Sequence, residues 1–174
     1  MAAEHRRVFF ALLPDVACAA RLEEAAQAVH GLCGGRPVRR EKLHLTLAFI
    51  GAATPAQIED LCAAAALVRG EAFELRIDRY GSFRRSQIVW AGCSEVPVQL
   101  SALAAALPGA AAAFAAHVSL LRKAPGSAAA WPALAAIRWP VGEFVLAESR
   151  LGEAATPYRI IARWPLASGR PGAG

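Results

Sequence analysis

The chain has little of what metal sites, disulfide frameworks and membrane spans are made from. It contains only four cysteines and four histidines in 174 residues. The cysteines form no CxxC pair, and a chain of this length can build a hydrophobic core without disulfides, so we expect reduced thiols. No stretch approaches the ~18 apolar residues that cross a bilayer, because Pro108-Gly109 interrupts the longest alanine-rich run. We therefore predict a soluble protein that does not enter a membrane.

The N-terminal region resembles a secretion signal only superficially. Arg6-Arg7 precedes an apolar run over residues 8–13, which ends at Pro14-Asp15. The run is too short and wrongly flanked for a signal peptide. We therefore expect the protein in the cytoplasm.

Composition sets the size and the charge of the protein. The length fits one domain, which we predict over residues 1–166, followed by a disordered tail at 167–174. A net charge of +5 and a pI near 9.5 suit phosphate-bearing partners. Nearly all the basic residues are arginine in an alanine-rich chain, a pattern that genomic base composition also produces. Charge alone therefore does not identify RNA as the partner.

The order of elements predicts an α+β fold. Strands are expected at residues 8–13, 43–50, 73–80, 87–93, 115–121, 143–151 and 158–164. Helices are expected at residues 15–32, 54–68, 98–107 and 131–137, the first two with capping signals at Asp15 and Thr54. Hairpins make the sheets antiparallel or mixed. We predict a bilobed, pseudo-symmetric fold, with two sheets facing a central cleft and helices on the outside.

Two segments repeat one pattern of histidine, apolar residue, hydroxyl and apolar residue. They are His44-Leu45-Thr46-Leu47 and His117-Val118-Ser119-Leu120. Side chains two apart on a strand share a face, so each segment presents an imidazole beside a hydroxyl. Brought together, the segments supply two titratable bases and two hydroxyl donors around one point. This set suits acid–base chemistry on a phosphate.

Other interpretations of the histidines are weaker. One histidine at the start of an apolar strand is usually a structural side chain, and a single short motif has a high false-positive rate. The match of both copies at all four positions favours a shared site. Neither motif has a carboxylate, a cysteine or a second histidine at ligand spacing, so metal binding is disfavoured. We expect no cofactor.

On these residues the chain resembles the two-histidine phosphoesterases, and among them the RNA 2′,3′-cyclic phosphodiesterases, also called bacterial 2′-5′ RNA ligases. The matching landmarks lie at residues 7–12, 41–51, 81–83, 88–92, 144–151 and 158–166. The resemblance implies hydrolysis of a 2′,3′-cyclic phosphate at the end of an RNA or oligonucleotide to a 2′-phosphate, with reversible 2′-5′ ligation as a further possibility. It implies His44 as general acid and His117 as general base.

The phosphate is expected to lie between the two motifs. The hydroxyls of Thr46 and Ser119 can donate hydrogen bonds to its charged non-bridging oxygens. Arg122 stands where the family places a phosphate-binding arginine. Strict alternation turns Arg122 away from the His117 face, so a bulge or its long reach must bring it back. A solvated Arg122, with Lys123 as its substitute, is the alternative. We expect a monomer and a bell-shaped pH profile with its maximum near neutral pH.

Three residues depart from the family pattern. Ala116 replaces a usual proline, Ser119 a usual threonine, and Leu121 a usual small residue. Alternation places Leu121 on the His117 face, where it narrows the site. These departures support a second hypothesis, an RNA-end-binding protein with little or no turnover.

Basic residues precede the first motif. Arg39, Arg40 and Lys42 either guide an RNA backbone or form a solvated loop.

Overall fold

The structure is a computed structural model that describes residues 5–126, 131–149 and 158–168. Most strands of this part of the chain form one eight-stranded sheet in the order β10-β9-β1-β3-β7-β6-β5, with β2 also paired to β7. Its strands are β1 (Arg6–Leu12), β2 (Arg36–Pro37), β3 (Leu45–Ala53), β5 (Arg79–Phe83), β6 (Ile88–Gly92), β7 (Val118–Arg122), β9 (Glu143–Ser149) and β10 (Arg159–Pro165). A second sheet pairs β4 (Phe73–Ile77) with β8 (Ile137–Val141). All these strand pairs are antiparallel, and with the three helices below they confirm the predicted α+β class.

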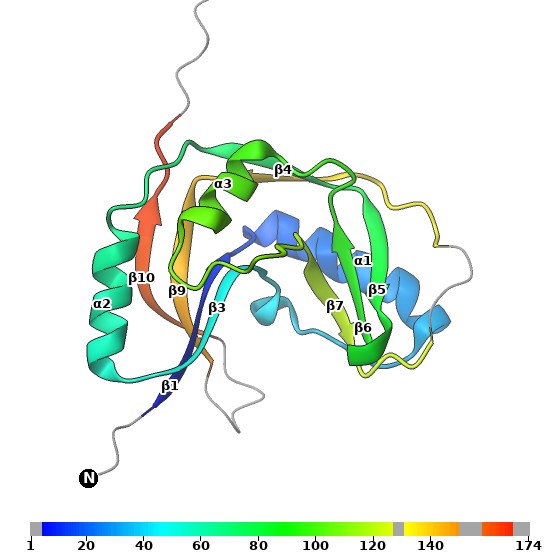
Figure 1. Cartoon of the computed structure of the whole chain (residues 1–174). Helices are drawn as coiled ribbons and strands as arrows, with labels where there is room; N and C mark the ends of the chain where they lie inside the picture. The colour runs from blue at the N-terminus through cyan, green and yellow to red at the C-terminus, as the bar shows by residue number, and fades with distance from the viewer. Residues whose placement is uncertain (1–4, 127–130, 150–157, 169–174) are drawn as a thin grey trace, which may run out of the picture.

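The large sheet consists of two halves that meet at one point. Leu45 of β3 pairs with Val118 of β7, and this is the single residue pair recorded between the two strands. Figure 1 shows β1, β3, β9 and β10 curving on one side and β5, β6 and β7 on the other. This division corresponds to the two predicted lobes, with one motif in each.

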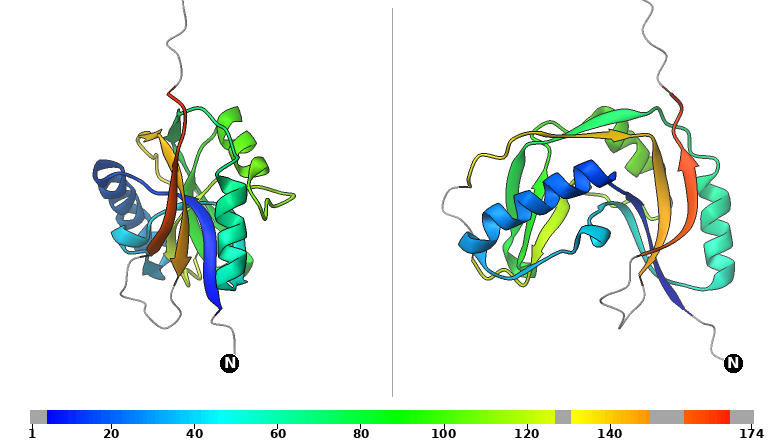
Figure 2. Two further views of the ribbon diagram at one scale, coloured as in Figure 1. Left: turned by 90° about the vertical axis from the view of Figure 1, so that its left-hand side faces the viewer. Right: turned by 180° about the vertical axis from the view of Figure 1, so that it is seen from behind.

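Helices lie on both sides of the strands. They are α1 (Val16–Cys33), α2 (Pro55–Ala65) and α3 (Val98–Ala106). Figure 2 shows α1 on one side of the strands and α2 and α3 on the other. Helix α1 contacts β6 and β7. The main core lies between these helices and the strands and includes Phe10, Leu22 and Leu120, all fully buried.

Local capping signals place the helix starts as predicted. Asp15 accepts a hydrogen bond from the Cys18 amide at the start of α1. Thr54 and Gln57 form a reciprocal capping box at α2, with Pro55 at the first helical position. Such signals act within one turn of the chain, so the sequence alone reveals them.

The helix predicted at residues 131–137 is wrong. Residues 131–136 form no regular element, and β8 follows. Ile137, Trp139 and Val141 are buried while Arg138 and Pro140 are exposed, which is a period of two. Pairing with β4 decides the structure here, and β4 lies far away in the sequence.

The strand predicted at residues 73–80 is divided in two. It breaks at Asp78, whose carboxylate accepts hydrogen bonds from the Ser94 amide and hydroxyl. The two parts join different sheets, β4 in one and β5 in the other.

The C-terminal end of the described chain pairs with the segment between α2 and β4. Ala167 forms a parallel bridge with Glu71, just beyond the predicted domain boundary. Residues 169–174 lie outside the described part, so the extent of the tail stays a prediction. Within the described ranges, no helix is long and apolar enough to cross a membrane.

Candidate active site

The contact between the lobes brings the two motifs together. Leu45 and Val118 are fully buried where β3 meets β7. His44 and His117 each precede one of these two residues, so the antiparallel register sets His44 beside Ser119 and Thr46 beside His117. We call the surface that carries these four side chains the histidine face. The pseudo-symmetry predicted from the tetrapeptides is thus centred on the Leu45–Val118 pair.

Both imidazoles are held by the same backbone contact. His44 Nδ1 lies 2.8 Å from the carbonyl oxygen of Lys42, and His117 Nδ1 lies 2.7 Å from that of Ala115. A carbonyl oxygen only accepts, so Nδ1 carries the proton and donates in each ring. This leaves Nε2 of each neutral ring as an acceptor. His44 Nε2 lies 3.1 Å from Thr46 Oγ1, whose hydroxyl can donate to it.

Aromatic rings flank each histidine. The Phe9 and Tyr158 ring centroids both lie 5.0 Å from that of His44. The Phe83 ring stands edge-on to His117 at 4.9 Å, and the Trp90 ring lies 6.3 Å away. The sequence does not predict these four as site residues, because they come from segments that lie far apart in the chain. Their rings restrict rotation of the imidazoles and cover part of each ring.

Burial makes both histidines weak bases in the free protein. The pKa of His44 falls from 6.5 to about 4; burial is the largest cause, the hydrogen bond to Lys42 opposes it, and the charges of Arg122 and His117 add smaller lowering effects. Burial also lowers the pKa of His117, and Arg122 contributes in the same direction. Both rings are therefore neutral at pH 7 before substrate binds. A bound phosphate anion opposes the Arg122 charge and favours protonation.

A bulge in β7 decides where Leu121 and Arg122 point. Opposite the adjacent residues Val89 and Trp90 of β6 stand Leu121 and Ser119, so Leu120 is an extra residue in β7. Leu120 and Leu121 are both fully buried in the core. The prediction that Leu121 shares the His117 face is therefore wrong, because the extra residue shifts the alternation. The same shift returns exposed Arg122 to the histidine face.

The first motif has the same irregularity. Between Thr46 and Phe49, β3 contains Leu47 and Ala48, both buried, where β1 supplies a single residue. Phe49 therefore shares the histidine face and is 53% exposed. The guanidinium of Arg7 lies 5.0 Å from its ring centroid. Five residues after each histidine, then, β3 presents an exposed aromatic ring and β7 presents an arginine.

The charge of Arg122 reaches the whole site. It lowers the pKa of His44, of His117 and of Tyr158, although burial is the larger effect on each group and raises the pKa of Tyr158 overall.

The basic residues before the first motif make different contacts. Arg40 is paired with Glu23, and Lys42 Nζ lies 5.6 Å from the centroid of the Tyr158 ring.

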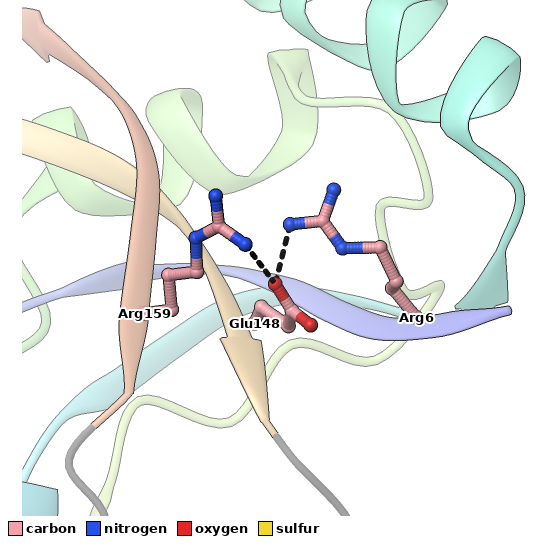
Figure 3. A network of polar contacts seen from close by, with 3 residues as sticks. All are labelled: Arg6, Glu148 and Arg159. Atoms are coloured by element: carbon pink, nitrogen blue, oxygen red, sulfur yellow. Dashed lines mark hydrogen bonds and ion pairs between the residues drawn. The ribbon is translucent and has the colours of Figure 1, made fainter. Parts of the chain in front are cut away.

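An ion-pair network braces the strand ends near Tyr158. Glu148 is only 7% exposed and is the buried charged residue of the described chain. Its carboxylate lies 2.5 Å from Arg6 and 3.9 Å from Arg159, so it links β9 to both neighbouring strands (Figure 3). Arg159 begins β10 and follows Tyr158 directly, so the network helps to fix the chain next to the Tyr158 ring.

The donor set at the site is unsuited to a metal ion. Each motif offers one imidazole and one hydroxyl, without a carboxylate or thiolate. Across the described residues, no three histidine, cysteine, aspartate or glutamate side chains gather as metal ligands would. The cysteines with described positions are free, and three of the four are buried.

Comparison with known proteins gives the family. A sequence model described as "LigT like Phosphoesterase" matches residues 12–90. A protein of Escherichia coli (strain K12) named RNA 2′,3′-cyclic phosphodiesterase is 34% identical over 141 residues, which cover 76% of this chain and 80% of that protein. The chain belongs to the LigT-like phosphoesterase family. It is an enzyme of the phosphoesterase class, and the resemblance seen in the two motifs is confirmed.

Other LigT-like relatives agree in sequence and fold. A Thermus thermophilus protein, also named RNA 2′,3′-cyclic phosphodiesterase, is 29% identical over 92% of this chain and 90% of its own length. The crystal structure of E. coli LigT complexed with phosphate superposes with a TM-score of 0.81 at 34% identity, covering 94% of this chain and 99% of that one. The complex with 3′-AMP gives 0.81 at 32% identity over the same shares.

Proposed function

We propose that this protein hydrolyses 2′,3′-cyclic phosphate ends of RNA to 2′-phosphates by metal-free acid–base catalysis. The observation that carries the proposal is the pairing of two histidine–hydroxyl units about the Leu45–Val118 contact, with Arg122 on the same face. The names of the LigT-like relatives support the substrate class. Reversal of the same steps would join 2′-5′ ends.

The proposed roles follow from the acceptor nitrogens. His117 Nε2 takes a proton from water as the water oxygen attacks phosphorus. The bond from phosphorus to the ribose 3′ oxygen breaks, and protonated His44 Nε2 donates its proton to that oxygen. The Thr46 and Ser119 hydroxyls and the Arg122 guanidinium stabilise charge on the non-bridging oxygens. The exposed ring of Phe49 offers a stacking surface for a base.

The alternative, an RNA-end-binding protein with little turnover, has lost one of its supports. It rested on Ala116, Ser119 and Leu121, and Leu121 lies in the core rather than in the site. Ser119 retains the hydroxyl that the proposed mechanism needs. Ala116 has no explanation in the structure.

The product of the reaction separates the two functions. We expect an oligonucleotide ending in a 2′,3′-cyclic phosphate to be converted to a 2′-phosphate end, and exhaustive EDTA treatment to leave the rate unchanged. Phosphorus NMR distinguishes the cyclic, 2′ and 3′ species. A cyclic end that is bound but unchanged would favour the alternative, and a 3′-phosphate would mean that the ribose binds in the opposite orientation. Loss of turnover in EDTA, restored by one divalent ion, would overturn the metal-free scheme.

The pH dependence should differ between kcat/KM and kcat. Catalysis requires one imidazole protonated and the other neutral, so both profiles are bell-shaped, with limbs that belong to the coupled pair. In the free protein both pKa values lie below 6.5, so the singly protonated pair is most populated on the acid side of neutrality, which moves the expected maximum of kcat/KM below the near-neutral value suggested by the sequence. The maximum of kcat/KM, which reports the free enzyme, should therefore lie below that of kcat, which reports the substrate complex. Coincident maxima, or a flat profile from about pH 5 to 9, would contradict this assignment.

A further inference from the structure

Strand β2 places a second arginine directly beside Arg122. Arg36 and Pro37 pair with Arg122 and Leu121 of β7 in antiparallel register. Residues opposite each other in such a pair share a face, with Cβ atoms about 5 Å apart. Arg36 therefore lies with Arg122 on the histidine face, and both residues are exposed. The register thus places two positive charges side by side, which is unfavourable unless an anion lies near them.

The protein contains a second cross-strand arginine pair, which is neutralised. Arg76 of β4 stands opposite Arg138 of β8. Arg76 lies 3.4 Å from Asp78, and Arg138 lies 2.9 Å from Glu74. For Arg36 and Arg122, the described residues include no carboxylate within ion-pair distance. Of the two pairs, only the one next to the catalytic histidines thus lacks counter-charges from the described chain.

The backbone around Arg36 is shaped for this close approach. Gly35 has a φ of +85°, a conformation that side-chain-bearing residues rarely adopt. A Cβ there would lie 2.7 Å from the Arg122 carbonyl oxygen and 2.8 Å from the Ala124 Cα. On the other side, the Val38 amide donates to the Leu120 carbonyl oxygen at 2.8 Å. The position of Arg36 beside Arg122 is therefore fixed by the backbone on both sides.

The two arginines can serve different phosphates. The charge of Arg122 lowers the pKa of both histidines and of Tyr158. We therefore assign the Arg122 guanidinium to the terminal phosphate. Arg36 flanks Arg122 on the edge of β7 away from β6, the same edge that meets β3 at the Leu45–Val118 pair. We propose that Arg36 binds the phosphodiester on the 5′ side of the terminal nucleotide. The substrate is then an RNA strand rather than a cyclic mononucleotide, which deepens the proposed function and rests on it.

Binding of reaction products tests this assignment without requiring turnover. The probes are a single-stranded oligoribonucleotide ending in a 2′-phosphate and the matching nucleoside 2′-monophosphate. Arg36→Gln should weaken binding of the oligonucleotide about fivefold to tenfold at low salt and leave that of the mononucleotide within about twofold. The slope of log Kd against log salt should fall in magnitude by about 0.7 for the oligonucleotide. Arg36→Lys, which keeps the charge, should restore most of the binding.

A matched control removes the same charge elsewhere. Arg21 lies on α1, which packs on the other face of the sheet. Arg21→Gln should therefore change the binding of neither probe. Equal losses for both probes in Arg36→Gln would mean that Arg36 serves the terminal phosphate, and no loss would remove its role. Either result overturns the inference. If the protein failed to hydrolyse a cyclic end but showed the selective loss, the proposed function would fail while the second phosphate site would stand.

Discussion

Replacing either histidine of the pair by alanine is expected to lower kcat/KM by ~10²–10⁴-fold, the usual contribution of one acid–base group. In the proposed mechanism, His44→Ala removes the proton donor for the leaving oxygen, and His117→Ala removes the base that activates water. Hydrolysis of a cyclic-phosphate oligonucleotide, followed under identical conditions, measures both losses.

The controls for this prediction come from the chain itself. His30 is an exposed histidine on α1 outside both motifs, so His30→Ala should retain near-normal turnover. His44 is packed between two rings, so its replacement by alanine leaves a gap. His44→Asn is a second variant, whose side-chain amide keeps a polar group near the position of Nδ1. Thermal unfolding shows whether each variant is folded. A folded variant of either paired histidine with near-normal kcat/KM would contradict the acid–base assignment.

Arg122→Ala should produce the second largest loss, about 10- to 100-fold in kcat/KM, because a hydrogen-bonded charge at the phosphate is removed. Arg122→Lys should recover only part of it, since an ammonium lacks the planar fork that binds two oxygens at once. The pKa of both histidines should rise in Arg122→Ala, which removes the positive charge that lowers them in the wild type, and should change less in Arg122→Lys, which keeps that charge. NMR titration of the imidazole protons measures this shift.

Lys123 is the matched control for Arg122. It is the adjacent residue, carries the same charge and is also exposed. Lys123→Gln should change kcat/KM little. A larger loss in Lys123→Gln than in Arg122→Ala would assign the phosphate contact to Lys123 and leave Arg122 a solvated residue at a strand end.

The sequence predicts the histidine–hydroxyl pairs because strand alternation is a local rule. His44 with Thr46, and His117 with Ser119, need only a period of two to share a face. The helix starts at Asp15 and Thr54 are equally local, since the capping side chains bond amides within the same turn. These features depend on the immediate neighbours of a residue and not on the rest of the sheet.

The sequence does not predict the two bulges, which depend on the neighbouring strands. The extra residue Leu120 becomes visible only when β7 is aligned with β6. Without that register, alternation assigns Leu121 to the site and turns Arg122 away from it, and both assignments are reversed in the structure. The sequence does not place Phe49 on the histidine face either, because the face of Phe49 depends on the pairing of β3 with β1.

Residues contributed by distant strands form the remaining part of the site. Phe9 and Tyr158 are separated by most of the chain and yet pack on the same imidazole. The sequence does not single out Arg36, because its pairing with Arg122 arises between strands far apart in the chain. Such contacts are set by the sheet order, which a single sequence does not reveal.

The double variant His44→Ala/His117→Ala tests most directly whether the two histidines act as one unit on a single phosphate. Measured as kcat/KM on the same cyclic-phosphate oligonucleotide, its activity should lie little below that of the worse single variant, because removing either member already disables the concerted proton transfers. If instead the two reductions multiplied, each histidine would contribute independently, and the account of a paired acid–base site would be contradicted.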